Sequence, residues 1–213
     1  MKKVTSILVV VVALLVVMTG MALASTISNT KHNLSLTSNN TISGDVQEVC
    51  IYCHTPHGGD QAVAPLWNRT NNIGRTFVTY GEGQSSSTYS QTPGQPSGVS
   101  MACLSCHDGA SSINTLLNKG GQPYNTGTDT KIPVGLANLG VSLLNDHPIG
   151  VSVDNAISHD NEIKTPTLAG VRVFGANHTV ECASCHNVHD NSRGLFLAAF
   201  NTNSDLCLAC HMK

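Results

Sequence analysis

The residues of this chain that can do chemistry are mainly cysteines and histidines. All eight cysteines occur in four copies of one pattern, Cys-x-x-Cys-His. In this pattern two thiols three positions apart can form thioethers with the two vinyl groups of one haem, and the next imidazole can bind its iron. The expected thioether residues are Cys50, Cys53, Cys103, Cys106, Cys182, Cys185, Cys207 and Cys210, and the expected proximal ligands are His54, His107, His186 and His211. The sequence therefore predicts four covalently attached haem c groups.

Two other chemistries also use Cys-x-x-Cys pairs. Four pairs could build two zinc sites, each with four thiolate ligands, or they could be redox-active disulfides in an exported protein. Neither chemistry needs a histidine after every pair, and histidine accounts for only 10 of the 213 residues. The histidine after each pair therefore favours haem attachment over zinc or disulfides.

Six further histidines could supply the sixth ligand of the irons. His57 and His189 each follow a proximal histidine by three residues, so they can reach a neighbouring haem but not the far side of their own. His147 precedes Pro148, which favours an extended loop suited to holding a ligand. His32 would tie down a polar N-terminal segment that would otherwise be mobile. We expect His32, His57, His147 and His189 to be the four distal ligands.

The remaining histidines, His159 and His178, lie in polar loops. We expect them to be solvated, or to substitute if one of the four chosen ligands is wrong. Methionine is the other common distal ligand, but Met101 and Met212 lie on the proximal side of their own motifs. Bis-histidine ligation at every iron is therefore expected. Such irons have no open position for a substrate, so we predict an electron carrier and not an enzyme.

The N-terminus has the pattern of a secretory signal peptide. Lys2 and Lys3 precede an apolar run, and the small-residue site Ala22-Leu23-Ala24 follows it. The run from Ile7 to Val17 is too short for a membrane span, so no span is expected. We expect residues 1–24 to be removed on export, which fits haem attachment outside the cytoplasm.

Residues 25–213 are expected to form a single domain that lacks a large side-chain core. Charged residues make up 11% of the sequence and aromatic residues 4%, against about 25% charged residues in an average domain. The net charge is −2 and there is no basic run, so nucleic acid is not an expected partner. Arg69 and Arg75 could pair with haem propionates or be solvated. We expect a loop-rich multihaem cytochrome, with a few short helices and little sheet, wrapped around its haems.

A few elements can be placed along the chain. Residues 25–45 are expected to form a polar N-terminal arm, and residues 81–100 a flexible loop rich in Gly, Ser and Gln. Short helices are expected over residues 111–119 and 134–144. Another short helix is expected to begin near Ser204 and to carry the fourth motif.

Several segments resemble the secreted tetrahaem cytochromes of the OmcE type. They are Lys31-His32-Asn33-Leu34-Ser35, the stretch from Val49 to Gly58, Pro65-Leu66-Trp67-Asn68-Arg69, Asp146-His147-Pro148 and the stretch from Cys182 to His189. The resemblance implies a homopolymer, namely an extracellular or cell-surface filament whose stacked bis-histidine haems carry electrons from upstream redox proteins to extracellular acceptors. It implies the same four distal histidines, one of them donated by a neighbouring subunit. His32 is the expected donor, on reach alone.

Two other functions stay open from the sequence. A soluble periplasmic tetrahaem shuttle would have the same haem count, but a monomer should close all of its axial bonds within one chain. A multihaem reductase would need an open iron position, whereas all four motifs end in histidine and the remaining histidines exceed the need. The filament-forming electron conduit is the function that the sequence favours.

Overall fold

The computed structural model describes residues 27–36, 38, 40, 42–63, 66–70, 75–81, 93–121 and 130–212. The expected signal peptide lies outside these residues. Residues 82–92 of the expected flexible loop also lie outside them. Both interpretations therefore stay predictions.

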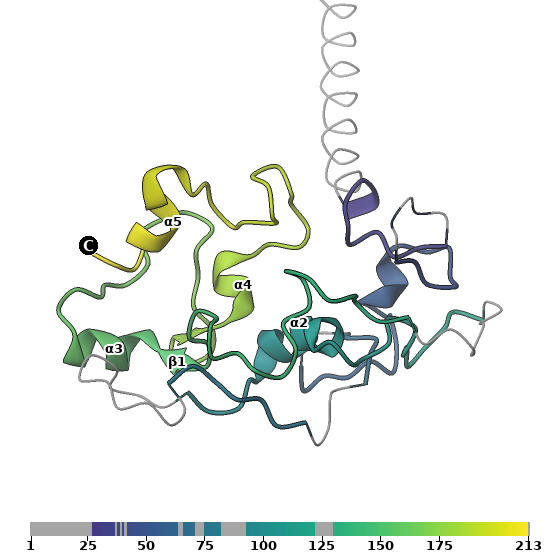
Figure 1. The fold of residues 1–213 in the computed structure, drawn as a ribbon, viewed down its shortest axis with the longest axis horizontal. Coiled ribbons are helices and arrows are strands. Elements are labelled where there is room, and N and C mark those ends of the chain that lie inside the picture. Colours follow the sequence, from purple (N-terminus) through teal and green to yellow (C-terminus); the bar gives the residue numbers. More distant parts are fainter. Residues whose placement is uncertain are drawn as a thin grey trace, which may run out of the picture.

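Regular secondary structure is short and sparse in the described part of the chain. The helices are η1 (Cys50–Tyr52), α2 (Gly98–His107), α3 (Val153–His159), α4 (Cys182–Cys185), η2 (Thr202–Ser204) and α5 (Asp205–Leu208), where η denotes a 3-10 helix. Strands β1 (Val151–Ser152) and β2 (Thr179–Val180) pair antiparallel, with Val151 opposite Val180. Figure 1 shows these elements joined by long loops. The expected loop-rich fold with short helices and little sheet is confirmed.

Each cysteine motif forms one turn of helix. The second motif ends α2. In the other three, the backbone N–H of the motif histidine donates to the carbonyl of the first cysteine, in the pairs His54–Cys50 at 2.9 Å, His186–Cys182 at 3.1 Å and His211–Cys207 at 2.9 Å. Residues three and four positions apart share one face of such a turn. Both cysteines and the histidine of a motif therefore lie on one side of the backbone, as attachment to a single haem requires.

The four helical turns follow one another along the long axis of the molecule (Figure 1). The segment with η1 lies beside the N-terminal arm, α2 and α4 occupy the middle, and α5 lies near the C-terminus. Ser100 connects the two middle helices, because its hydroxyl donates to the Glu181 carboxylate and accepts from the Cys182 N–H at 3.0 Å. Neighbouring motifs are thus held together by polar contacts.

The side-chain core is divided into small clusters. Their buried members are Val46, Tyr52 and Leu116 in the first, Val63, Trp67 and Ala102 in the second, and Phe77, Leu104 and Leu143 in the third. The N-terminal arm joins the first cluster through Leu34, and the Leu36 N–H donates to the Val46 carbonyl at 2.8 Å. Clusters of three side chains bury little apolar area, and stability rises with that area.

In the described residues, no helix is long and apolar enough to cross a membrane.

Two of the expected helices are not formed. Residues 111–119 form turns, and residues 134–144 form turns and extended backbone. In the second segment the Val141 carbonyl accepts from the Val78 N–H at 2.9 Å, and the Leu143 N–H donates to the Val78 carbonyl at 2.8 Å. Pairing with a distant segment therefore overrides the local helical pattern.

The expected helix near Ser204 is confirmed. Helix α5 begins at Asp205 with Ser204 as its N-cap residue, although the Ser204 side chain makes no capping bond. The expected loop over residues 81–100 ends earlier than predicted, because α2 begins at Gly98.

Candidate haem-binding sites

All eight cysteines are free of disulfides, so each motif has both thiols available for thioether bonds. Thiols of successive motifs lie close together. Cys103 and Cys182 share a hydrogen bond, which raises the pKa of Cys103 and lowers the pKa of Cys182 to about 7. Burial raises the pKa of Cys185, and the nearby Cys210 and Cys207 add to the rise. Among the described residues, no group of three or more His, Cys, Asp or Glu side chains could hold a metal ion by itself.

The first two motifs also adjoin each other. Burial raises the pKa of the Cys53 thiol to about 12, with the neighbouring Cys106 adding to the rise and the Arg69 cation opposing it. Burial also raises the pKa of Cys106, again against the effect of Arg69. The attachment points of motifs one and two therefore share one buried cation.

Three pairs of histidine rings lie at nearly the same distance, two of them edge-on and the His54–His189 pair with its planes 17° apart. The ring centroids are 6.1 Å apart for His54 and His189, 6.1 Å for His32 and His107, and 6.2 Å for His147 and His211. Each pair joins one expected proximal ligand to one expected distal ligand. Two metal–nitrogen bonds of about 2.0 Å, plus the distance from each nitrogen to its ring centre, give a centroid separation of about 6 Å. The spacing of each pair therefore fits one iron between the two imidazoles.

Backbone carbonyls orient three of the imidazoles. Nδ1 of His107 lies 2.6 Å from the Ala137 carbonyl oxygen. Nδ1 of His186 lies 3.0 Å from the Leu195 carbonyl oxygen, and Nδ1 of His147 lies 2.9 Å from the Pro148 carbonyl oxygen. A carbonyl can only accept, so Nδ1 of each ring carries the proton and donates it. Nε2 is then left as the acceptor nitrogen, which is the form that binds a metal.

His32 lies in a half-buried position that keeps its imidazole neutral. Burial, with smaller contributions from the neighbouring His107, His186 and His189, lowers its pKa to about 4. Its ring packs edge-on against Phe196, with centroids 4.3 Å apart. The buried Nδ1 atom has no hydrogen-bond partner in the described part of the chain. A neutral imidazole with an unpaired nitrogen suits an iron ligand.

His57 and His186 are the two expected ligands without a ring contact to another imidazole within the described residues, although His186 lies near enough to His32 to lower its pKa. His57 is exposed, and the backbone of its loop is held in place because its carbonyl accepts from Thr55 Oγ1 at 2.9 Å and Asn118 Nδ2 at 2.8 Å. His32, the expected donor to a neighbouring subunit, lies against His107 of its own chain, and its role across an interface stays a prediction. Sequence reach alone could not reveal this contact.

The two spare histidines have other partners. Nδ1 of His159, at the end of α3, lies 2.8 Å from Ser158 Oγ and 3.0 Å from the Asn155 carbonyl. Nδ1 of His178 lies 2.7 Å from Asp154 Oδ2. Both rings are exposed, and neither faces another imidazole in the described residues. His178 lies in a turn as expected, whereas His159 ends helix α3 and does not lie in a loop.

Exposed apolar side chains lie beside two proximal histidines. Leu136 is 103% exposed and precedes Ala137, whose carbonyl accepts from His107. Leu195 is 80% exposed, and its own carbonyl accepts from His186. Exposed apolar groups that gather at one place usually mark a binding surface. Apolar side chains next to iron-binding imidazoles fit an apolar macrocycle, so the residues present fit haem.

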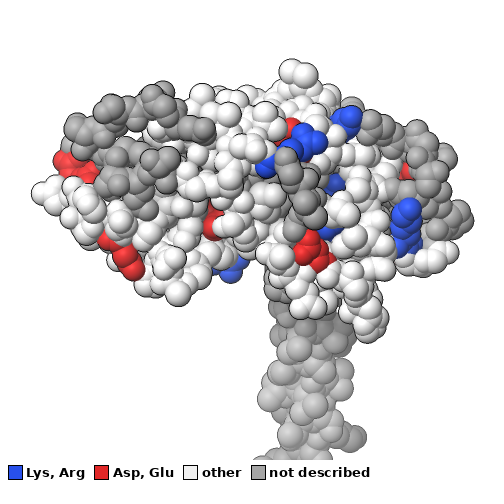
Figure 2. Space-filling view, turned by 90° about the horizontal axis from the view of Figure 1, so that it is seen from below, with Lys and Arg blue, Asp and Glu red and all other residues white. Residues whose placement is uncertain are grey.

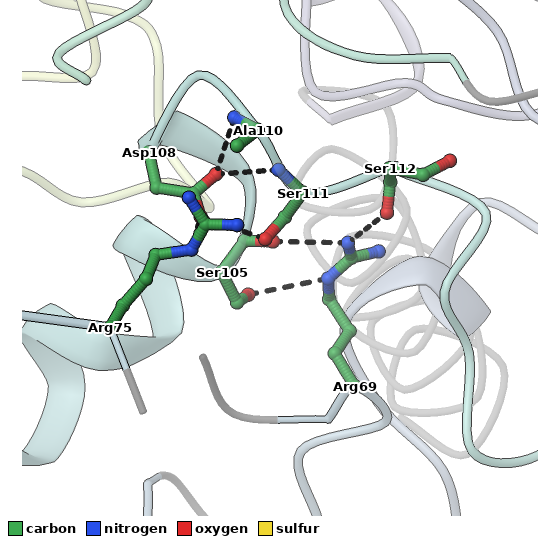
Figure 3. Close-up of polar contacts among 7 residues, drawn as sticks. All are labelled: Arg69, Arg75, Ser105, Asp108, Ala110, Ser111 and Ser112. Atoms are coloured by element: carbon green, nitrogen blue, oxygen red, sulfur yellow. Dashed lines mark hydrogen bonds and ion pairs between the residues drawn. The ribbon is translucent and has the colours of Figure 1, made fainter. Parts of the chain in front are cut away.

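Arg69 is occupied by hydrogen bonds within the protein, and Arg75 is held by an ion pair through its Nε atom. Figure 3 shows the Arg69 guanidinium bonded to Ser105 and to the carbonyl of Ser112, and Arg75 paired with Asp108. The Arg75 Nε–Asp108 Oδ2 distance is 3.0 Å. The burial of Arg69 was missed from the sequence, because an arginine after Trp67 and Asn68 carries no local signal of a buried position.

The third and fourth motifs have a recognised counterpart. Residues 176–213 match the family described as doubled CXXCH motif. No curated protein matches the chain. The family match, together with the helical turns that align two thiols and an imidazole, suggests a multihaem c-type cytochrome. The motifs indicate covalently bound haem c and support an electron-transfer role.

We expect His189→Ala to convert one iron from low-spin to high-spin, because it removes the imidazole that faces His54. The measurement is the absorption and electron paramagnetic resonance of the oxidised, haem-loaded protein. His178→Ala is the matched control, because His178 is bonded to Asp154 and should leave every iron low-spin. A high-spin signal in the control, or none in His189→Ala, would contradict this pairing.

Proposed function

We propose that this chain is a tetrahaem electron-transfer protein that polymerises into an extracellular electron-conducting filament. In this proposal His57 of one subunit binds the iron attached beside His186 in the next. The observation that carries the proposal is the arrangement of the eight candidate ligands. Six form three facing pairs within one chain, and one proximal and one distal candidate are left apart. Two unmatched ligands per chain are what a repeating bond between identical subunits needs.

The chain's own residues would hold four haems. The eight cysteines would supply the thioethers, and the iron positions would lie between His54 and His189, His107 and His32, and His211 and His147. When bound, each haem supplies a one-electron ferric–ferrous couple. The carbonyls that accept from Nδ1 keep the imidazoles oriented, so the ligands move little when the charge of the iron changes.

A bond from His57 to the iron at His186 joins two different surfaces of the same chain. Such a heterologous contact produces an open filament when its rotation does not close a ring. Both imidazoles are exposed, and the backbone contacts of the His57 loop reduce the entropy lost on binding. A metal–ligand bond also adds its free energy directly to the association.

We propose an electron carrier and not an enzyme, because bis-histidine ligation at all four irons leaves no open position. Upstream redox proteins would supply electrons, and extracellular acceptors would take them. Figure 2 shows a face on which acidic and basic side chains are scattered among uncharged ones, so that face offers no basic patch for nucleic acid. Secretion is proposed from the N-terminal leader, and the OmcE resemblance supports the filament.

Electron microscopy of the secreted, haem-loaded protein over a dilution series tests this proposal. We expect uniform thin filaments that persist on dilution, because each junction includes an iron–histidine bond. Dispersed single subunits at every concentration would contradict polymerisation. The soluble periplasmic shuttle would then be the better explanation of the same haem motifs.

A further inference from the structure

Arg69 is a buried cation without an acidic partner among the described residues. Its residue is 1% exposed. Its guanidinium donates to four oxygens, namely Ser105 Oγ at 3.2 Å, the Ser105 carbonyl at 3.1 Å, the Ile113 carbonyl at 2.6 Å and the Ser112 carbonyl at 2.6 Å. All four acceptors are neutral. Within the described residues no carboxylate lies within ion-pair distance of Arg69.

The nearest ion pair does not cancel this charge. Asp108 is 2% exposed and is paired with Arg75, and it also accepts from the Ala110 and Ser111 N–H groups and from the Ser111 hydroxyl. Figure 3 shows this pair beside the Arg69 network. One carboxylate and two guanidinium groups leave one net positive charge at this place.

The segment that holds Arg69 joins the first two haem motifs. The backbone N–H of Asn68 donates to the Cys53 carbonyl at 2.9 Å, and its side chain donates to the Ile51 carbonyl at 2.7 Å. The next residue, Arg69, holds Ser105, which lies between the two cysteines of motif two. Asn68 and Arg69 therefore clamp one motif each, and the cation lies at their junction.

We propose that Arg69 is a positioning residue whose fixed charge raises the reduction potentials of the haems attached at motifs one and two. Reduction removes one positive charge from an iron, so a nearby cation destabilises the oxidised state more than the reduced state. Burial limits screening by solvent and salt, and the four hydrogen bonds fix the position of the charge. Arginine stays protonated at all accessible pH values, so the effect is permanent. The inference rests on bis-histidine haems at these two motifs and does not need filament formation.

The test compares Arg69→Gln, Arg69→Lys and Arg172→Gln in the haem-loaded protein by spectroelectrochemical titration. Arg69→Gln should raise the oxidised-to-reduced ratio of two haems about tenfold at fixed electrode potential, which is about 59 mV for one electron. Arg172 is exposed over the Phe174 ring, so Arg172→Gln removes the same charge and should change the ratio less than about twofold. An unshifted Arg69→Gln curve with all haems bound and low-spin would overturn the inference.

Arg69→Lys separates charge from packing and keeps the inference testable if Arg69→Gln fails to fold. Lysine retains the charge but can lose it when buried. We expect potentials close to the wild type at neutral pH, falling below the wild type as the pH rises and the lysine loses its proton. Potentials that fall at neutral pH as far as in Arg69→Gln, with no added pH dependence, would assign the effect to packing. Haem count and spin state are recorded first, since their loss would count against the proposed haem ligation instead.

Discussion

His57→Ala is expected to abolish filaments and leave dispersed, folded, haem-loaded subunits. The reason is that His57 is the one distal candidate with no facing imidazole in the described residues, so its loss breaks no bond within the chain. The iron beside His186 would then lack its sixth ligand in every subunit. Electron microscopy measures the loss of filaments, and electron paramagnetic resonance should report one high-spin iron per chain.

His32→Ala is the informative comparison, because it removes a ligand that faces His107 of the same chain. We expect this variant to show a high-spin iron and yet to assemble. Added in small amounts to wild-type protein, His57→Ala should also shorten the filaments, because it can accept a histidine but cannot donate one. Filaments of normal length and number in pure His57→Ala would refute the crossing ligand. Loss of filaments only in His32→Ala would restore His32 to that role.

The same chain produced without haem attachment is expected to lose cooperative thermal unfolding. Its buried clusters contain three side chains each, and apolar residues such as Val134 and Leu136 are 99% and 103% exposed. Folding must offset about 1–2 kcal/mol of backbone entropy for each ordered residue, which so small a core cannot do. Circular dichroism during heating is the measurement.

A graded control uses Cys50→Ser together with Cys53→Ser, which removes the thioethers of motif one only. This double variant should carry one haem fewer by pyridine haemochrome assay and melt at a lower temperature, still cooperatively. If the haem-free chain melts as sharply and at the same temperature as the haem-loaded protein, haem burial does not stabilise the fold in place of a side-chain core.

Haem attachment can be predicted from the sequence because the residues that it needs lie within one helical turn. Two thiols three positions apart and an imidazole one position further lie on one face of a single helical turn, whatever the rest of the chain does. The start of α5 near Ser204 was also predictable from the local sequence, although the Ser204 side chain makes no capping bond. The sparse charge and few aromatic residues likewise predicted a chain without a large side-chain core, and the described residues pack in small clusters.

The pairing of histidines is a property of the tertiary structure. His54 and His189, or His32 and His107, are brought together across long stretches of loop that have no helical or strand periodicity. Sequence reasoning could select the distal candidates but not their partners, and it chose His32 as the crossing ligand on reach alone. Long-range packing likewise turned residues 134–144 into a partner of Val78 instead of a helix, and buried Arg69 between two motifs. Spacing within one turn is set by bond geometry, whereas contacts between distant segments depend on how the whole chain packs.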